Sequence, residues 1–225
     1  KLLRNLPDVG ITTVCFNFMA HYGWTRTSRE LPERGGALVT GFSADDFRED
    51  GYVMTHERLG ANFDYFMKAV IPVAESVGVR LALHPDDPPL ESLGGVARMF
   101  TSLEKITGAI DRYHSPVFGV TFCQACYQLM GEDLENAIKT LADKIFFVHF
   151  RNVRGDKMNF SETYHDNGDI DMARAIRLYT KYCPDGAREI PIRVDHVPTL
   201  PFEIGNRDGY DALGRLFAIG YLKGL

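Results

Sequence analysis

The sequence has little cysteine, no long apolar run and no excess of positive charge, and each shortage excludes a class of protein. Four cysteines among 225 residues are too few for a disulfide framework, so we expect a reduced, cytoplasmic protein. No run approaches the roughly 20 apolar residues that cross a bilayer, and the first residues lack the apolar core of a signal peptide, so we expect no membrane partner. The 25 basic and 30 acidic side chains give a net charge of -5, which argues against a nucleic-acid partner.

Several common functional motifs are also missing. The sequence has no GxGxxG, P-loop or HExxH motif, so dinucleotide, nucleoside triphosphate and zinc-protease functions lack support. Cys123 and Cys126 do form a CxxC pair after an apolar run. This spacing could indicate thioredoxin-like redox chemistry, but the surrounding pattern of a small thioredoxin-like domain is missing.

Short apolar runs alternate with segments of helical period along the chain. The runs predicted as buried parallel strands are Ile11 to Phe18, Val79 to His84, Val117 to Cys123, Ile145 to Phe150 and Ile190 to Val197. The segments predicted as helices are Asn62 to Val77, Leu93 to Ile110, Leu134 to Leu141, Asp171 to Tyr182 and Asp211 to Leu222. This alternation predicts an α/β fold with a parallel sheet. The stretch from Trp24 to Tyr52 has neither period and is predicted to be a functional loop.

Four of the five predicted strands deliver a potential metal ligand at the carboxyl end, where α/β barrels build their sites. The four ligands are His84, Cys123, His149 and Asp195. Taken alone, Cys123 is better explained as a small buried hydrophobe, and His84 as a residue that ends a strand and hydrogen-bonds a loop. For His149, a hydrogen-bonded core histidine is as good an explanation as a ligand. A carboxylate in an apolar strand needs a cation nearby, and the recurrence at equivalent strand ends favours a metal site.

Other polar residues near these strand ends are candidates for binding a substrate. Arg151 and Arg193 each lie two residues from a predicted ligand and therefore share its face of the sheet. Guanidinium groups beside a metal suit a ligand with a carboxylate and hydroxyls, although Arg151 in a surface loop and Arg193 in a simple ion pair are the alternatives. Asn17 and Asn152 are further candidates for hydrogen bonds to substrate.

Several segments, in matching order, resemble the mannonate dehydratase family, which has a metal-dependent TIM barrel related to xylose-isomerase-like folds. The segments are VCFNFMAHYGWTRT, RGGALVTGF, IPVAESVGVRLALHPDDPP, TFCQACY, FFVHFRNV, IRVDHVPTL and GYDALGRLFAIGYLKGL. The resemblance implies a divalent cation, Mn2+ or Fe2+, held by the four strand-end residues. It also implies that His196 and Tyr210 lie at the reacting carbons of the substrate.

The resemblance implies the dehydration of a small sugar acid, D-mannonate, to 2-keto-3-deoxy-D-gluconate. Tyr210 is the candidate base and His196 the candidate acid, with the roles open to exchange, and Asp195 is expected to be a catalytic residue as well as a metal ligand. We also expect a homo-oligomer, a dimer. In two places the sequence departs from the family pattern: VDHV lacks the usual proline and glycine around the Asp-His pair, and QACY replaces a run of smaller residues.

Only five of the family's eight barrel strands are predicted in this chain. We therefore expect a single (β/α) barrel domain over residues 1–225 that lacks the N-terminal third. Two alternatives to dehydration follow from the fold and the shortened barrel. One is a metal-dependent sugar isomerase of the same fold, and the other is a catalytically silent remnant that binds a metal without turnover. A related barrel that cleaves phosphodiesters at abasic sites is disfavoured by the acidic charge.

Overall fold

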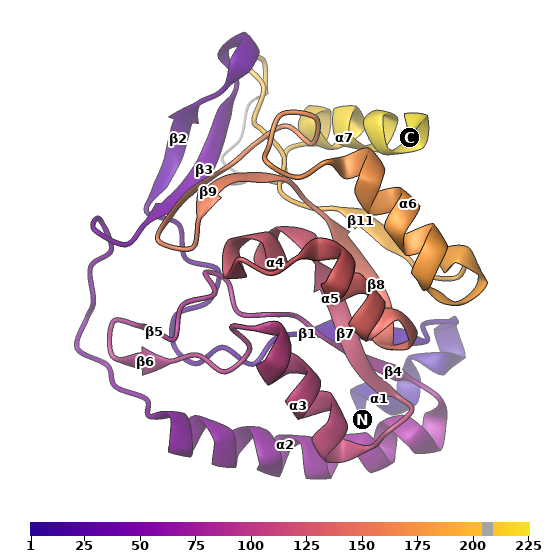
Figure 1. Cartoon of the computed structure of the whole chain (residues 1–225). Coiled ribbons are helices and arrows are strands. Elements are labelled where there is room, and N and C mark those ends of the chain that lie inside the picture. The colour runs from indigo at the N-terminus through magenta and orange to yellow at the C-terminus, as the bar shows by residue number, and fades with distance from the viewer. Residues whose placement is uncertain (204–208) are drawn as a thin grey trace.

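A five-stranded parallel sheet forms the centre of the computed structural model, which describes residues 1–203 and 209–225 (Figure 1). The order across the sheet is β1-β4-β7-β8-β11, and each neighbouring pair is parallel. The strands are β1 (Thr13–Phe16), β4 (Arg80–Leu83), β7 (Phe118–Cys123), β8 (Ile145–Phe150) and β11 (Ile192–Val194). The predicted α/β fold is confirmed, with strands in chain order as expected for part of a barrel.

Helices precede, connect and follow these strands, and those that connect them pack against one face of the sheet (Figure 1). They are α1 (Leu2–Asn5), α2 (His56–Val77), α3 (Leu103–Tyr113), α4 (Gln124–Met130), α5 (Leu134–Leu141), α6 (Met172–Tyr182) and α7 (Ala212–Gly224). Short 3-10 turns lie at Pro7–Val9, Arg34–Gly36, Ala142–Lys144 and Pro184–Ala187. Among the described residues, no helix combines the length and apolar character needed to cross a membrane.

The main core lies between the helices and one face of the parallel sheet. In α2, Phe63, Met67 and Ile71 recur every fourth residue and are buried, as expected of a helix with one apolar face. They pack with strand residues such as Leu83 and Val120 in one cluster. Because strand side chains alternate between faces, the strand residues beside these core positions point to the opposite, inner face. That inner face carries the predicted metal ligands.

Gly119 lets β7 and β8 come together beside this core. A Cβ atom at Gly119 would lie 2.3 Å from the carbonyl oxygen of Lys144 and 2.6 Å from the ring of Phe146. Any larger residue there would push the two strands apart. The register that places Cys123 opposite His149 therefore depends on a glycine four residues before the cysteine.

A second, antiparallel sheet stands away from the parallel one (Figure 1). Its order is β2-β3-β10-β9, formed by β2 (Ser28–Pro32), β3 (Leu38–Ser43), β9 (Val153–Asp156) and β10 (Asn159–Glu162). The prediction of a loop from Trp24 to Tyr52 was therefore wrong for part of this stretch. The pairing of β3 with β10 joins residues more than 100 positions apart, which local periodicity cannot reveal.

The predicted helix from Leu93 to Ile110 starts ten residues too early. Residues 92–97 form a small hairpin of β5 (Ser92–Leu93) and β6 (Val96–Ala97), and α3 begins at Leu103. Gly94 and Gly95 turn this hairpin with positive φ angles of 52° and 76°. The helix starts where the Ser102 side chain accepts a hydrogen bond from the backbone N–H of Lys105.

Candidate metal and substrate site

The four predicted metal ligands meet on the inner face of the parallel sheet. His84 follows β4, Cys123 ends β7, His149 lies in β8, and Asp195 follows β11. Cys123 and His149 are paired in register, and Nδ1 of His149 lies 3.4 Å from Oδ2 of Asp195. The rings of His84 and His149 have centroids 4.9 Å apart. All four side chains are buried, so the structure brings together two imidazoles, one thiol and one carboxylate.

Cys126 joins this cluster, although it was not predicted as a ligand. One ring nitrogen of His84 and the sulfur atoms of Cys123 and Cys126 all lie within 4.8 Å of one another. Cys126 reaches the site because the chain turns directly from β7 into α4, whose first turn carries it. The CxxC spacing was the signal in the sequence that could have included it.

The electrostatics of the cluster favour a bound cation. Burial would raise the pKa of the Cys123 thiol, but hydrogen bonds with Cys126 and the two histidines, with the charge of Arg151, hold that pKa well below its usual value. Burial would also raise the pKa of Asp195, yet the neighbouring histidines and Arg193 hold it well below its usual value. The site therefore holds a thiolate and a carboxylate in a buried place, with cationic groups beside them.

The donor set fits a divalent transition metal. Burial lowers the pKa of His149, but Asp195 and the Cys123 thiolate outweigh burial and raise it to about 9. Nδ1 of His149 is buried without a well-formed hydrogen bond. Imidazole nitrogen, thiolate sulfur and carboxylate oxygen are the ligand types of transition metals, so residues at this place can hold such an ion.

Beneath the cluster lies a buried network of two arginines and two carboxylates. Arg26 donates to both oxygens of Asp87 at 3.0 and 2.9 Å and to Glu162 at 2.8 Å. Arg151 donates to Asp87 at 2.8 Å and to Glu162 at 2.6 and 2.8 Å. Burial would raise the pKa of Asp87, but the two guanidinium groups hold it far below its usual range. Sequence reasoning missed Arg26, Asp87 and Glu162, because their partners lie far away along the chain.

The structure places the predicted substrate-binding residues at different depths. Arg151 is fully buried in the network and also donates toward the sulfur atoms of both site cysteines, so its contact with substrate stays a prediction. Arg193 forms an ion pair of 2.9 Å with Asp195, yet its side chain is 40% exposed and remains within reach of a ligand. Asn152 donates to backbone oxygens of the 165–170 loop, and the Asn17 side chain accepts from the backbone of Met19 at 3.4 Å.

His196 and Tyr210 form a hydrogen-bonded pair beside Asp195. The Tyr210 hydroxyl lies 3.1 Å from Nε2 of His196, whose backbone has a positive φ of 45°. Burial lowers the pKa of His196, and burial with the charge of Asp195 raises the pKa of Tyr210. A neutral His196 can therefore accept a hydrogen bond from the Tyr210 hydroxyl through Nε2. A non-glycine residue in the left-handed region costs free energy and is common at functional sites.

A cavity of about 180 Å³ opens next to this pair. It is lined by Trp24, Arg26, Arg29, Thr40, His196 and Tyr210. The ring of Trp24 also meets the ring of His84 edge-on, with centroids 6.0 Å apart. The cavity therefore lies beside the His196 and Tyr210 pair, and Trp24 in its wall contacts His84 of the cluster. The segment from 24 to 40 supplies four of its lining residues.

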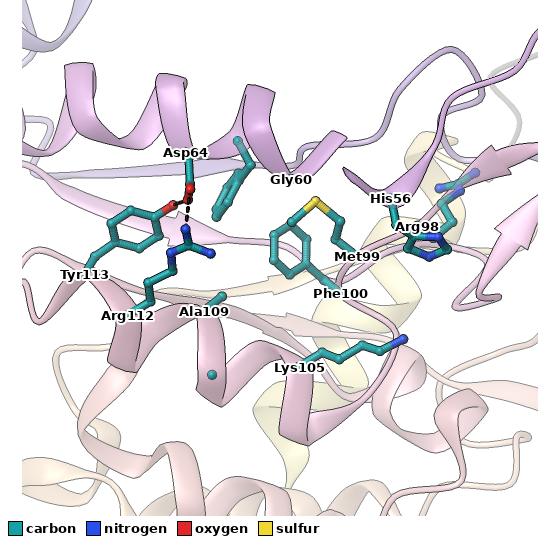
Figure 2. A pocket seen from close by; sticks show the side chains of 12 residues that line it. His56, Gly60, Asp64, Arg98, Met99, Phe100, Lys105, Ala109, Arg112 and Tyr113 are labelled. Carbon is teal, nitrogen blue, oxygen red and sulfur yellow. Dashed lines mark hydrogen bonds and ion pairs between the residues drawn. The ribbon is translucent and has the colours of Figure 1, made fainter. Parts of the chain in front are cut away.

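Another pocket, of about 300 Å³, lies between α2 and α3 (Figure 2). Apolar side chains such as Phe63, Met99 and Phe100 form part of its wall, and Asp64 points toward Arg112 and Tyr113. None of the residues that line it belongs to the strand-end cluster. It is therefore separate from the candidate site.

The parallel strands in chain order and the outer helices define part of a TIM-barrel fold. A xylose-isomerase-like TIM-barrel protein from Mycobacterium smegmatis, solved in complex with magnesium, matches with a TM-score of 0.61 and 13% identity, over 98% of this chain and 63% of that one. The mannonate dehydratase of Streptococcus suis serotype 2 matches with a TM-score of 0.90 and 30% identity, over 99% of this chain and 66% of that one.

Sequence comparison gives the family. The D-mannonate dehydratase (UxuA) family model matches residues 1–55 and 46–225. The mannonate dehydratase of Streptococcus agalactiae serotype III is 34% identical over 261 positions, covering 100% of this chain and 72% of that protein. The mannonate dehydratase of Chromohalobacter salexigens is 30% identical over 297 positions, and the match covers 100% of this chain and 76% of that protein. The chain belongs to the D-mannonate dehydratase family, which confirms the predicted resemblance.

Proposed function

We propose that this site removes water from D-mannonate and yields 2-keto-3-deoxy-D-gluconate. The observation that carries the proposal is the placement of the His196 and Tyr210 pair directly beside the cluster of two histidines, one cysteine and Asp195. Membership of the dehydratase family supports the reaction class. Mn2+ or Fe2+ is the proposed ion.

His84, Cys123, His149 and Asp195 would hold the ion, which supplies Lewis-acid stabilisation of negative charge near the substrate carboxylate. The cationic side chains at the cavity fit the other polar groups of a sugar acid. Arg193 is partly exposed beside Asp195, and Arg26 lines the cavity although its charge is committed to two carboxylates. A guanidinium such as Arg193 can bind a carboxylate through two parallel hydrogen bonds, which fixes the orientation of the substrate.

The His196 and Tyr210 pair is suited to move the two protons of the reaction. Removal of the C2 proton leaves its electron pair to form a C2=C3 bond, while the C3–O bond breaks and the hydroxyl leaves as water. In the free protein, neutral His196 can accept the C2 proton and Tyr210 can protonate the departing hydroxyl. His196 is then the base and Tyr210 the acid, which reverses the first of the two assignments that the sequence left open. The resulting enol gains a proton at C3 and becomes the 2-keto product.

The experiment compares two cysteine variants for metal binding and product formation. Cys123→Ser removes a proposed sulfur ligand, whereas Cys183→Ser changes a buried cysteine at the end of α6, away from the cluster. We expect Cys123→Ser to lose Mn2+ affinity by calorimetry and to lose formation of the 2-keto acid, and Cys183→Ser to keep both. Full metal affinity in Cys123→Ser would show that this cysteine is not a ligand.

Turnover assays distinguish the remaining alternatives. Conversion of a sugar without loss of water would identify an isomerase, and metal binding without turnover on sugar acids would identify a catalytically silent protein.

We also propose a cytoplasmic location, which the four free cysteines support. A homodimer stays our proposal as well, and light scattering of the purified chain tests it.

A further inference from the structure

Cys126 is a second thiol at the site that the dehydration does not use. It lies in α4 with no exposed surface, and its sulfur lies within 4.8 Å of the sulfur of Cys123. Nη1 of Arg151 contacts both sulfur atoms, at 3.7 Å for Cys123 and 3.8 Å for Cys126. The two sulfur atoms therefore share one guanidinium nitrogen as a neighbour and lie close together.

The local chain geometry favours a bond between these two sulfur atoms. Cys123 ends β7 and Cys126 lies in the first turn of α4, so only two residues separate them across a tight turn. The remaining two cysteines lie elsewhere: Cys15 contacts Thr121 from β1, and Cys183 follows α6. A disulfide requires the sulfur atoms to approach to about 2.05 Å, and rotation of two short side chains can provide much of that approach.

We propose that Cys123 and Cys126 form a reversible disulfide when a peroxide reaches the metal-free site, and that this bond withdraws the sulfur ligand from the ion. The second part rests on the function proposed above. One thiol attacks a peroxide oxygen, the O–O bond breaks, and a sulfenic acid and water form. The other thiol then displaces the hydroxyl as water and closes the S–S bond. Two thiols and one peroxide thus give one disulfide and two waters, and peroxide is the species reduced.

Two features of the structure suit a reversible bond. The hydrogen bonds of Arg151 to Asp87 and Glu162 do not involve either thiol, so we expect the buried network to be retained when the thiols are oxidised. A sulfur atom bound to a cation has its electron pair engaged and reacts more slowly with peroxide. Occupancy by the metal would therefore protect the pair, and an empty site would be the form that oxidises.

The test treats the reduced, EDTA-stripped protein with hydrogen peroxide and then labels the remaining thiols with N-ethylmaleimide in denaturant. We expect the peptide that contains both cysteines to lack two hydrogen atoms, to carry no label, and to regain both thiols with dithiothreitol. Preloading with Mn2+ should slow this change. Calorimetry on the same samples should show that Mn2+ affinity falls on oxidation and returns on reduction.

Variants separate the disulfide from its proposed consequence. Neither Cys126→Ser nor Cys126→Ala can close the bond, so dimedone should trap a sulfenic acid on Cys123 in both variants. The control Cys183→Ser should form the disulfide as the parent does. Full labelling of both thiols under conditions that oxidise the exposed Cys15 would overturn the proposal. A disulfide that forms without changing Mn2+ affinity would overturn only the loss of the ligand, and with it the assignment of Cys123 to the metal.

Discussion

The Tyr210 hydroxyl is a group of the site that can be removed while the ring that carries it stays in place. The ring of Tyr210 packs beneath the guanidinium groups of Arg193 and Arg215, at 5.3 and 5.1 Å, and its hydroxyl bonds to His196. We expect Tyr210→Phe to lower turnover by roughly 100-fold to 10,000-fold, because a positioned acid is lost while the ring remains. Metal content and melting temperature should change little. The rate of 2-keto acid formation and a thermal melt measure the two effects.

Tyr65→Phe is the matched control, since Tyr65 is 81% exposed on α2. It should turn over at the parental rate. Near-parental turnover in Tyr210→Phe would remove this residue from the mechanism and leave the proton to another group of the site.

Individual site residues differed in how far the sequence could predict them. His84 and Cys123 end apolar runs, so their edge of the sheet follows from the strand period alone. Strand alternation also predicted the face of the sheet on which Arg151 lies, but it did not predict that this side chain is buried. Its partner Glu162 lies in β10, which belongs to the antiparallel sheet. Two-residue periodicity identifies a direction for each side chain. It contains no information about which distant carboxylate will meet that side chain.

Glu135 links two neighbouring helices through charges at the surface. On α5, it accepts hydrogen bonds from Arg174, Lys181 and Tyr182 of α6. The hydrogen bond from Tyr182 is the largest cause that lowers its pKa to about 2, from an ordinary value of 4.5. Because the folded pKa lies below the unfolded one, the stabilisation is complete above pH 4.5 and is lost as the pH falls toward 2.

We therefore expect Glu135→Gln to lower the free energy of unfolding at pH 7 and to approach the parent as the pH falls through this window. Urea titrations of both proteins at pH 7, 4 and 3 measure the difference. Glu30→Gln, at an exposed position of β2, is the control and should show no such convergence. A difference that stays constant with pH would show that the carboxylate charge contributes nothing to the α5 and α6 contact.

Element boundaries were predictable where the signal was local. The bounds Leu134 to Leu141 were predicted as observed, with Asp133 capping the first turn through the backbone N–H of Asn136. The start of α3 was missed because an apolar run continues through a glycine hairpin into the helix. The antiparallel sheet was missed altogether, since each of its strands is short and obtains its hydrogen bonds from remote partners.

At the scale of the whole molecule, one buried ionic network joins the two sheets. Glu162 ends β10 of the antiparallel sheet and pairs with Arg151, which directly follows β8 of the parallel sheet. We expect Glu162→Gln to reduce the free energy of unfolding by roughly 3 to 5 kcal/mol, because two buried guanidinium groups lose a charged partner. Urea denaturation at neutral pH measures this loss. Glu135→Gln, at a partly exposed ion pair, should lose much less.

An equal loss of unfolding free energy in the two variants would mean that the buried network stabilises the fold no more than a surface ion pair does.

The family and the α/β architecture were predictable at the scale of the whole molecule, because the matching segments keep their order along the chain. The joining of the two sheets was not predictable. It depends on charged residues that carry no periodic signal.

The position of β11 has a consequence for how metal binding can be detected. This strand has only three residues, lies at one end of the sheet order, and is followed directly by Asp195 and His196. A short edge strand opens locally at low free-energy cost, whereas β7 lies between two neighbours. A cation that binds only the closed arrangement opposes this opening in proportion to its concentration. Amide hydrogens of residues 192–195 should therefore exchange with deuterium more slowly when Mn2+ is added, while those of β7 change little. Occupancy of the site would then be visible in the exchange rates of one short strand, without any substrate.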